Sequence, residues 1–428
     1  MRNPLLIALK GKGVQKTADR IRTLSSRYGP TASRMDRALA HFGKVLSEFE
    51  CGATFPITAA TLARNPGIIE KYQAQNMEFA VHGYYHVDHS QLSRQKQVED
   101  LSRARMLFNA RGVTSSGFRC PYLRYADDTL HAIKESGFLY DSSHSLVWDV
   151  ADGNATDSYM RVLEFYGARD ANKYPALPHI EKGLIEIPYC LPDDESLIER
   201  LQFDNNETRS KPWLDMLDKT YRLGELFTLG LHPERINLCE IPLRNTLQKA
   251  RSLFPAVWIA RLDEIAGWWS RRAMLEPKIT TTDSGEYRLE TEQIAGLTVL
   301  GRDVDFLGKF EKWDGNFVRA LGDNVQFRSR TRPVIGLSPS SDSRLESFLR
   351  QQGYIVEINQ TDDEYSIFLD RTHFPREDER ALLAEIEESN ASLIRFSRWP
   401  NGAKSALCVT GDIDALTIWD YVLRTLGK

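Results

Sequence analysis

The stretch MEFAVHGYYH, residues 77–86, decides how the rest of the chain is interpreted. Its first half alternates along the chain and leads to Gly83, which predicts a short strand followed by a turn. His82 then stands at the carboxyl end of that strand, and His86 follows four residues later. Two imidazoles at this spacing can face one metal ion, and neutral imidazole is a favoured zinc ligand. A catalytic zinc needs a third protein ligand and an open position, so the stretch predicts half of a metal site.

Length and composition are those of an ordinary globular protein. A chain of 428 residues indicates two or three domains, or one large domain with an insertion. The 55 basic and 59 acidic residues leave a net charge of -4, so we expect no nucleic-acid partner. The five cysteines are odd in number and form no CxxC pair, which is typical of reduced thiols.

The N-terminal residues show no targeting signal. The apolar run after Met1 stops at Lys10, which is too short for the core of a signal peptide. No apolar run approaches the roughly 20 residues of a membrane helix. We therefore expect a cytoplasmic protein without a membrane span. Residues 14–26 are weakly periodic and predict a helix.

Helices and strands alternate along the first 280 or so residues, which indicates an α/β domain with a parallel sheet. The alternation begins with a helix, so the usual first strand is missing. Residues 151–180 are rich in Asp, Asn, Pro and Gly and are predicted as a loop. Predicted strands cover residues 53–57, 77–81, 116–122, 138–143, 184–188 and 226–232, and predicted helices cover residues 35–49, 66–75, 92–110, 127–136 and 262–269.

The chain changes character after about residue 278. Its clearest later part is a βαβ pattern over residues 333–358, with Ser and Asp residues between the first strand and the helix. We therefore expect residues 283–392 to form a small α/β inserted domain of unknown role, while residues 1–282 and 393–428 form the main domain.

The last strand supplies the carboxylates that the beginning lacks. Residues 404–410, KSALCVT, read as a buried strand, and Gly411-Asp412-Ile413-Asp414 follow it directly. Two carboxylates thus lie at the carboxyl tip of a strand, where α/β sheets place their active sites.

These motifs together resemble those of the polysaccharide deacetylase superfamily, the NodB-like carbohydrate esterases. His82 and His86 match the family's HxxxH pair, residues 119–122 (RCPY) its RxPY motif, and residues 229–232 (LGLH) its LxxH motif. Residues 412–414 (DID) resemble the DxD form of the allantoinase-like branch. The resemblance implies an α/β fold of the distorted (β/α)7 NodB barrel type.

One departure concerns the order of the motifs. In the family the aspartate motif opens the domain, whereas here it lies close to the end of the chain. A circular permutation explains this order, because chain termini at a domain surface tolerate such rearrangement. The alternative is a strand supplied by a second protomer, so a homo-oligomer stays open.

The resemblance also implies the site. Asp414, His82 and His86 would hold Zn2+ or another divalent metal, which polarises an amide carbonyl and lowers the pKa of water.

The remaining motif residues take catalytic roles by the same resemblance. Asp412 would be the base, with Arg119 paired to it to keep it ionised. His232 would protonate the leaving amine, and the backbone amide of Tyr122 would stabilise the oxyanion.

The leading hypothesis is a metal-dependent hydrolase that removes N-acetyl groups from a sugar, polysaccharide or glycan precursor. One alternative is hydrolysis of another non-peptide C–N bond, as in a ureide or cyclic amide. A degenerate domain that binds carbohydrate without catalysis is the other. Asp88 and His89 are candidates for orienting the histidine ligands or for a solvated turn, and Asp141 for ordering the rim of the site.

Overall fold

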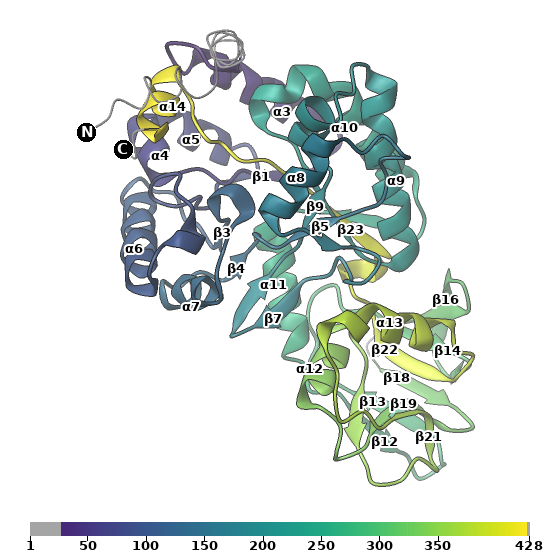
Figure 1. The fold of residues 1–428 in the computed structure, drawn as a ribbon. Helices are drawn as coiled ribbons and strands as arrows, with labels where there is room; N and C mark the ends of the chain where they lie inside the picture. Colours follow the sequence, from purple (N-terminus) through teal and green to yellow (C-terminus); the bar gives the residue numbers. More distant parts are fainter. Residues whose placement is uncertain (1–26, 323, 426–428) are drawn as a thin grey trace.

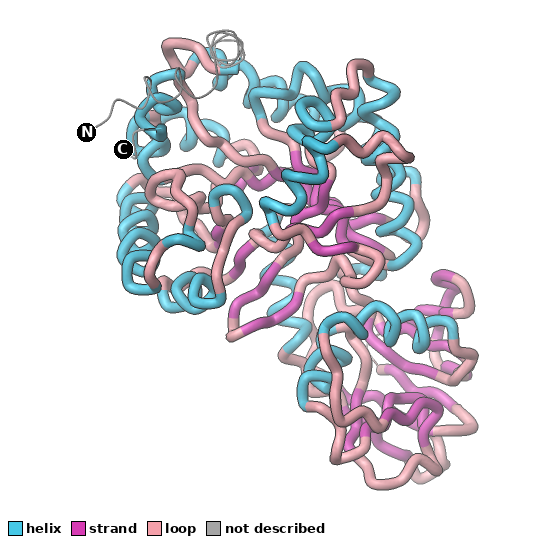
Figure 2. The backbone as a smooth tube through the Cα atoms, in the orientation of Figure 1, coloured by secondary structure: helices cyan, strands magenta, loops and turns pink. Residues whose placement is uncertain are grey.

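The computed structural model describes residues 27–322 and 324–425, which form a mixed α/β fold with a larger and a smaller lobe (Figure 1). The predicted helix over residues 14–26 lies outside the described residues. In the larger lobe the strands lie centrally and the helices surround them (Figure 2).

The helices and strands of the larger lobe come from both ends of the described chain. The helices are α3 (Ser33–Glu48), α4 (Ala59–Arg64), α5 (Pro66–Gln73), α6 (Arg94–Ala110), α7 (Asp127–Glu135), α8 (Asp157–Tyr166), α9 (Asn206–Leu223), α10 (Ile236–Ser252), α11 (Leu262–Ala273) and α14 (Ile418–Thr425). The strands are β1 (Ala53–Thr54), β2 (Met77–Glu78), β3 (Gly117–Phe118), β4 (Tyr140–Asp141), β5 (Ser145–Val147), β6 (Arg169–Asp170), β7 (His179–Glu181), β8 (Leu184–Glu186), β9 (Tyr189–Leu191), β10 (Leu226–Gly230), β11 (Val257–Ile259) and β23 (Ser405–Thr410).

The centre of the parallel sheet is β23, the last strand of the chain. It pairs with β10 over five residues, from Leu226 opposite Ala406 to Gly230 opposite Thr410. On its other side it pairs with β11 and then, at Thr410, with Thr54 of β1. All six residues of β23 are buried, as expected for a strand covered on both faces of a parallel sheet.

The parallel row continues from β1 through the strands that carry the N-terminal motifs. β1 pairs with β2, Val81 beyond β2 bridges Phe118 of β3, and β3, β4 and β8 follow in order. β5 pairs with β9, which lies beside β10 through the hydrogen bond that the Thr228 hydroxyl donates to the Pro188 carbonyl at 2.6 Å. No backbone ladder joins β9 to β10 among the described strands, so a closed barrel is not shown.

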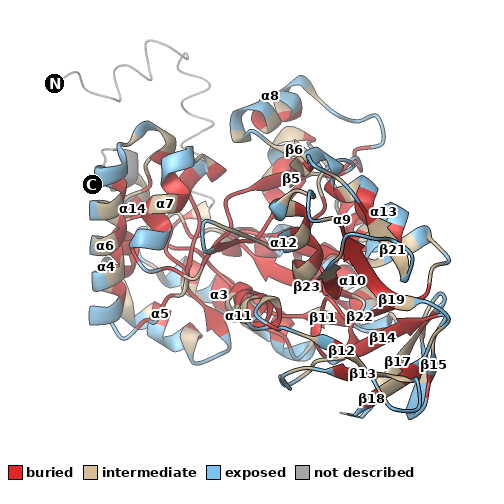
Figure 3. Ribbon diagram, turned by 90° about the horizontal axis from the view of Figure 1, so that it is seen from below, coloured by how far each residue is buried: buried red, intermediate tan, exposed pale blue. Residues whose placement is uncertain are grey.

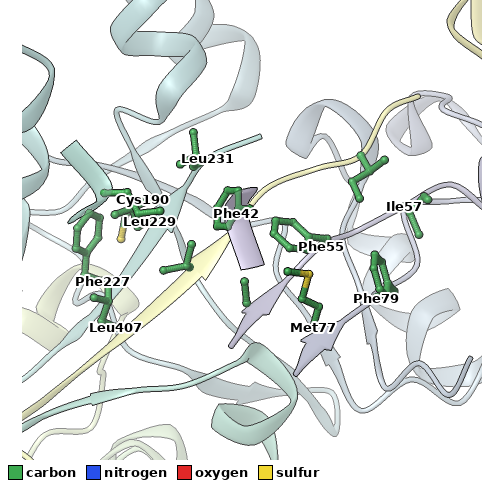
Figure 4. Packing of buried hydrophobic residues seen from close by; sticks show 14 of the residues in the cluster. Phe42, Phe55, Ile57, Met77, Phe79, Cys190, Phe227, Leu229, Leu231 and Leu407 are labelled. Carbon is green, nitrogen blue, oxygen red and sulfur yellow. The ribbon is translucent and has the colours of Figure 1, made fainter. Parts of the chain in front are cut away.

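Apolar side chains from both ends of the chain fill the same core (Figure 4). Phe42 of α3 and Phe55 meet edge to face at 5.2 Å between ring centroids, and Met77 and Phe79 lie beside them. Leu407 of β23 belongs to the same buried cluster. Figure 3 shows these central strands buried, whereas outer helices such as α6 and α7 expose one face. Hydrophobic burial therefore holds β23 in place, although β23 is far in the sequence from the strands on either side of it.

The smaller lobe contains the predicted βαβ pattern and two four-stranded antiparallel sheets, β12-β13-β18-β15 and β16-β17-β14-β22. β19 and β20 run parallel with α12 between them, which confirms that pattern. Its elements are β12 (Lys278–Thr281), β13 (Tyr287–Glu290), β14 (Val299–Arg302), β15 (Asp305–Phe306), β16 (Lys309–Asp314), β17 (Phe317–Leu321), β18 (Val325–Arg328), β19 (Arg332–Leu337), α12 (Ser343–Gln351), β20 (Val356–Ile358), β21 (Tyr365–Leu369), α13 (Glu379–Glu388) and β22 (Leu393–Phe396). β12 pairs with β13 and β22 pairs with β14, so the strands of this lobe begin and end slightly outside the predicted range 283–392. That residues 283–392 form an inserted domain stays a prediction.

Most predicted elements of the larger lobe are present, and one prediction is wrong. Residues 151–180 are not a loop, because they contain α8 and β6 and the start of β7. Thr156 caps α8 by accepting from the Tyr159 amide, and Gly167 ends it in a left-handed conformation. These short signals were hidden by the polar composition of the segment. Within the part of the chain that the structure describes, no helix has both the length and the apolarity for a membrane crossing.

Candidate metal centre

The residue after β23 brings the two aspartates against the neighbouring strand. A Cβ atom on Gly411 would lie 1.9 Å from the carbonyl oxygen of Leu231, a separation that only glycine avoids. The Gly411 amide also donates to the carbonyl of Thr54 at 3.3 Å. β23 is therefore clamped between β10 and β1 at the point where Asp412 and Asp414 follow.

Three predicted ligands lie together at this edge of the sheet. The candidate donor atoms of His82, His86 and Asp414 all lie within 4.8 Å of one another. The shortest of these separations, 3.2 Å, joins the Nε2 atom of His86 to a carboxylate oxygen of Asp414. Two imidazoles and one carboxylate form a donor set that suits zinc and related divalent ions.

The environment of His82 fits a metal ligand. Its side chain is fully buried, and its Nδ1 atom lies 2.9 Å from the carbonyl oxygen of Arg119, which sets the tautomer with Nε2 available. Burial lowers the pKa of His82 to about 4, so the ring is neutral, as a ligand must be. Its Nε2 atom has no hydrogen-bond partner among the described residues. The residues present therefore fit a divalent ion.

Asp412 does not join the cluster as a third ligand but binds Arg119. One guanidinium nitrogen of Arg119 donates to Asp412 at 2.9 Å and to the Thr410 hydroxyl at 3.1 Å. The other guanidinium nitrogens donate to the carbonyl and hydroxyl of Ser142. Burial acts to raise the pKa of Asp412, but the neighbouring imidazole of His82 and the guanidinium of Arg119 hold it below its usual range. Asp412 is therefore an ionised carboxylate beside the cluster, as a proton acceptor requires.

His232 approaches the same region from the end of β10. Its Nδ1 atom lies 2.8 Å from a carboxylate oxygen of Asp194, which is fully buried. Although burial opposes the positive charge, Asp194 raises the pKa of His232 to about 10. The ring is therefore protonated near neutral pH and can donate a proton.

Tyr122 occupies a strained turn at the mouth of the site. Its φ of 63° is left-handed, and Leu123 follows with a φ of 54°. The ring of Tyr122 meets that of His86 at 4.4 Å between centroids and is 38% exposed. Such backbone geometry is typical of functional turns.

A cavity of about 630 Å3 connects these residues. His86, Asp414, Asp412 and His232 line it, and aromatic side chains form much of the remaining wall. The aromatic residues are Tyr122, Phe165, Tyr166, Tyr189 and Tyr421. A cavity of this size with several rings suits a sugar-sized ligand.

The candidates for supporting roles separate in the structure. Asp88 caps the following turn by accepting from Ser90 and pairs with Arg124 at 2.9 Å. His89 is fully buried rather than solvated, against Phe118. Asp141 does not line the cavity.

Asp141 instead supports the RxPY segment from behind. It accepts from the Ser143 hydroxyl at 2.7 Å, and that oxygen accepts from the Cys120 amide at 2.8 Å. Burial raises the pKa of Asp141 to about 6.

Sequence reasoning missed Asp194. The signal was an acidic pair, Asp193-Asp194, that follows β9 at its carboxyl end, the same placement that identified Asp412 and Asp414. The structure thus brings together all seven predicted site residues and adds one carboxylate. The catalytic and ligand roles of the seven stay predictions.

A parallel α/β sheet with a His-His-Asp cluster at its carboxyl edge defines a protein suited to metal-assisted chemistry. Residues 28–140 match the family model described as polysaccharide deacetylase. A peptidoglycan deacetylase-like protein of Gibberella zeae is 41% identical over 185 residues, which are 38% of this chain and 54% of that protein. The chain thus spans about half the length of this relative.

Two solved structures are similar at lower identity. A probable polysaccharide deacetylase from Pseudomonas aeruginosa is 24% identical, with 55% of this chain and 73% of that chain covered and a TM-score of 0.43. An allantoinase is 22% identical, with 55% of this chain and 72% of that chain covered and the same TM-score, 0.43.

Proposed function

We propose that this protein is a metal-dependent deacetylase that removes N-acetyl groups from a sugar, polysaccharide or glycan precursor. The observation that carries the proposal is the adjacency of two units on one cavity: the His82–His86–Asp414 cluster and the Arg119–Asp412 ion pair. The family of residues 28–140 supports the same reaction class.

A bound divalent ion would supply polarisation of the amide carbonyl and a more acidic water. Of this chain's residues, His82, His86 and Asp414 would hold it. The carbonyl of Arg119 keeps the ring of His82 oriented for that role.

The chain's own groups account for both proton transfers. Asp412 accepts a proton from the attacking water while the oxygen of that water bonds to the acetyl carbon. Arg119 keeps the Asp412 carboxylate ionised beforehand. His232 then gives its Nε2 proton to the leaving nitrogen as the C–N bond breaks. The products are acetate and an amine. The Tyr122 amide is the proposed donor to the developing oxyanion.

We also propose that the larger lobe is the family's distorted barrel in a circularly permuted order. The support is the position of β23, which pairs with β1 and β10 of the same chain although it lies at the other end of the sequence. A cytoplasmic location stays part of the proposal.

Acetate release measured together with metal content tests the function. The wild-type protein loaded with Zn2+ is expected to release acetate from N-acetylated sugar oligomers, and Asp412→Asn is expected to lose about a hundredfold or more in kcat. Asp88→Asn is the matched control, because that carboxylate pairs with Arg124 instead. Zinc-loaded protein that hydrolyses ureides or cyclic amides, but no acetylated sugar, would favour the alternative C–N substrate. A protein that binds no metal would contradict both.

A further inference from the structure

A second cavity, of about 720 Å3, lies where the two lobes meet. Its walls include the end of α9, the start of β10 and the segment that leads into β23, with α13 and the β16–β17 turn on the other side. In Figure 1, α13 lies on the side of the smaller lobe that faces β23. This cavity is thus at the amino ends of β10 and β23, whereas the metal cluster follows their carboxyl ends.

Three buried arginines, Arg302, Arg395 and Arg398, line this cavity. Arg302 is held by backbone carbonyls at the end of α13, with donors 3.0 Å from the carbonyls of Ile386 and Glu387. Arg395 and Arg398, which are only 4% and 6% exposed, both pair with Glu387 at 3.3 Å.

Positive charge exceeds negative charge in the buried part of the cavity. Two other cations there are balanced, since Arg380 pairs with Glu225 at 2.9 Å and Lys404 with Asp314 at 2.7 Å. Arg395 and Arg398 share the carboxylate of Glu387, whereas Arg302 binds only the backbone carbonyl of that residue. The remaining acid and base of the wall, Glu388 and Arg222, are exposed.

The surplus of positive charge affects the pKa of a fourth buried arginine, which lies behind the cavity. Burial, together with the charges of Arg398 and Arg395, lowers the pKa of Arg272 to about 9. A buried charge is costly unless it is paired, and the three buried arginines that line the cavity, set against the single carboxylate of Glu387, leave a surplus of about two positive charges there.

Two guanidinium donors also lack acceptors. The Nε atoms of Arg395 and Arg398 make no hydrogen bond with the described residues. Both side chains are held in place: Arg395 is stacked on Phe317 and Tyr354 at 5.0 and 5.5 Å, and Arg398 donates to the carbonyl of Leu223 at 3.1 Å. Fixed planar guanidinium groups are suited to tetrahedral oxyanions, which they can bind in a bidentate manner.

We propose that this interlobe cavity binds a phosphate group, either free or as part of a phosphorylated metabolite, between Arg395 and Arg398. A phosphate dianion matches the surplus of two charges and offers acceptors to the unpaired donors. Its binding joins residues of both lobes, so it stabilises their association. The proposal is independent of the deacetylase reaction, because the metal cluster lies at the other ends of the strands.

Calorimetric titration of the full-length protein at constant ionic strength tests this. Inorganic phosphate and pyrophosphate are expected to bind saturably and to raise the melting temperature, whereas acetate at the same ionic strength does neither. Arg398→Gln is expected to weaken phosphate binding by about tenfold or more, and Arg398→Lys, which keeps the charge but not the fork, by less. Glucose 1-phosphate, compared with inorganic phosphate, distinguishes an organic phosphate ligand from the free ion.

Two controls separate this cavity from other sites. Arg328→Gln, at an exposed arginine of the same lobe, and Asp414→Asn, at the metal cluster, are both expected to bind phosphate as wild type does. The absence of saturable binding in the wild type overturns the proposal, and so does binding that survives Arg398→Gln but disappears in Asp414→Asn. Should Arg398→Gln fail to fold, the titrations of the wild type and of Arg398→Lys test the site instead. An unchanged phosphate affinity in Arg398→Lys would mean that the anion binds elsewhere.

Discussion

Two histidines of the metal centre must have opposite protonation states, and their surroundings set each of them. His82 must be neutral to act as a ligand, and burial lowers its pKa to about 4. His232 must be charged to donate a proton, and Asp194 raises its pKa to about 10 despite burial. Two histidines within one active-site region therefore differ in protonation because only one has a buried carboxylate as its partner.

The first prediction at this scale concerns Asp414. Asp414→Asn replaces the charged ligand by a weak neutral one, so bound zinc is expected to fall from about one ion per chain to a small fraction. Plasma emission spectroscopy on the dialysed protein measures the stoichiometry. Asp88→Asn is again expected to keep its metal, and full zinc in Asp414→Asn would show that this carboxylate is not a ligand.

The second prediction concerns Asp194. In Asp194→Asn, burial is no longer opposed, so the pKa of His232 falls to or below its ordinary value of about 6.5. The alkaline limb of kcat/KM, set by loss of the His232 proton, is then expected to move to lower pH. A pH profile with an unchanged alkaline limb would remove His232 as the acid.

Stability should follow the same linkage. The folded pKa of His232 lies above the unfolded one, so its contribution is complete below pH 6.5 or so and is lost as the pH rises through about 10. Asp194→Asn is expected to destabilise the protein by about 3 kcal/mol near pH 6, and by less above pH 10. Urea unfolding measures this, with Asp215→Asn, a surface partner of Lys211, expected to change stability little.

At the scale of elements, β23 is the piece on which the site depends. All of its residues are buried, the four between Ser405 and Thr410 are apolar, and the glycine that follows the strand lies against the backbone of Leu231. This contact supplies a physical reason for glycine at position 411.

Gly411→Ala is therefore expected to be costly. The added Cβ would lie 1.9 Å from the Leu231 carbonyl oxygen, so the two backbones must separate, with a loss of about 2 to 3 kcal/mol in unfolding free energy. Gly267→Ala, inside α11, meets no atom nearer than 3.4 Å and is expected to be neutral or slightly stabilising. Urea midpoints compare the pair, and equal stability of Gly411→Ala and wild type would mean that the clamp at the end of β23 is loose.

At the scale of the whole molecule, the order of the strands in space differs from their order in the chain. A rearranged protein with residues 403–428 placed ahead of residues 1–402 through a flexible linker of about 20 residues restores the order of the family. It is expected to fold and to bind zinc as wild type does, because β23 is held by pairing and burial. Circular dichroism and metal content are the measurements.

The matching control removes residues 403–428 altogether. Without β23, the edges of β10 and β1 are unpaired and two site carboxylates are lost, so this chain is expected to be insoluble or unfolded and to bind no metal. A truncated chain that still folds and binds zinc would argue against the permuted barrel.

The sequence by itself determined the local features of this protein: the alternation of helices and strands, the position of His82, Arg119 and Asp412 at strand ends, and the resemblance of residues 28–140 to polysaccharide deacetylases. These follow from periodicity and from residue types within short windows. It failed for α8, whose helical signals are few among polar residues, and for Asp194, which carries no motif.

Only the tertiary structure decided which strands are neighbours and which charges meet. Thr54 and Thr410 pair across almost the whole chain, and Arg395 and Arg398 meet the end of α9 across the lobes. Such contacts depend on the total burial of apolar surface and on the balance of buried charge. Those quantities belong to the folded molecule and leave no periodic trace in the chain.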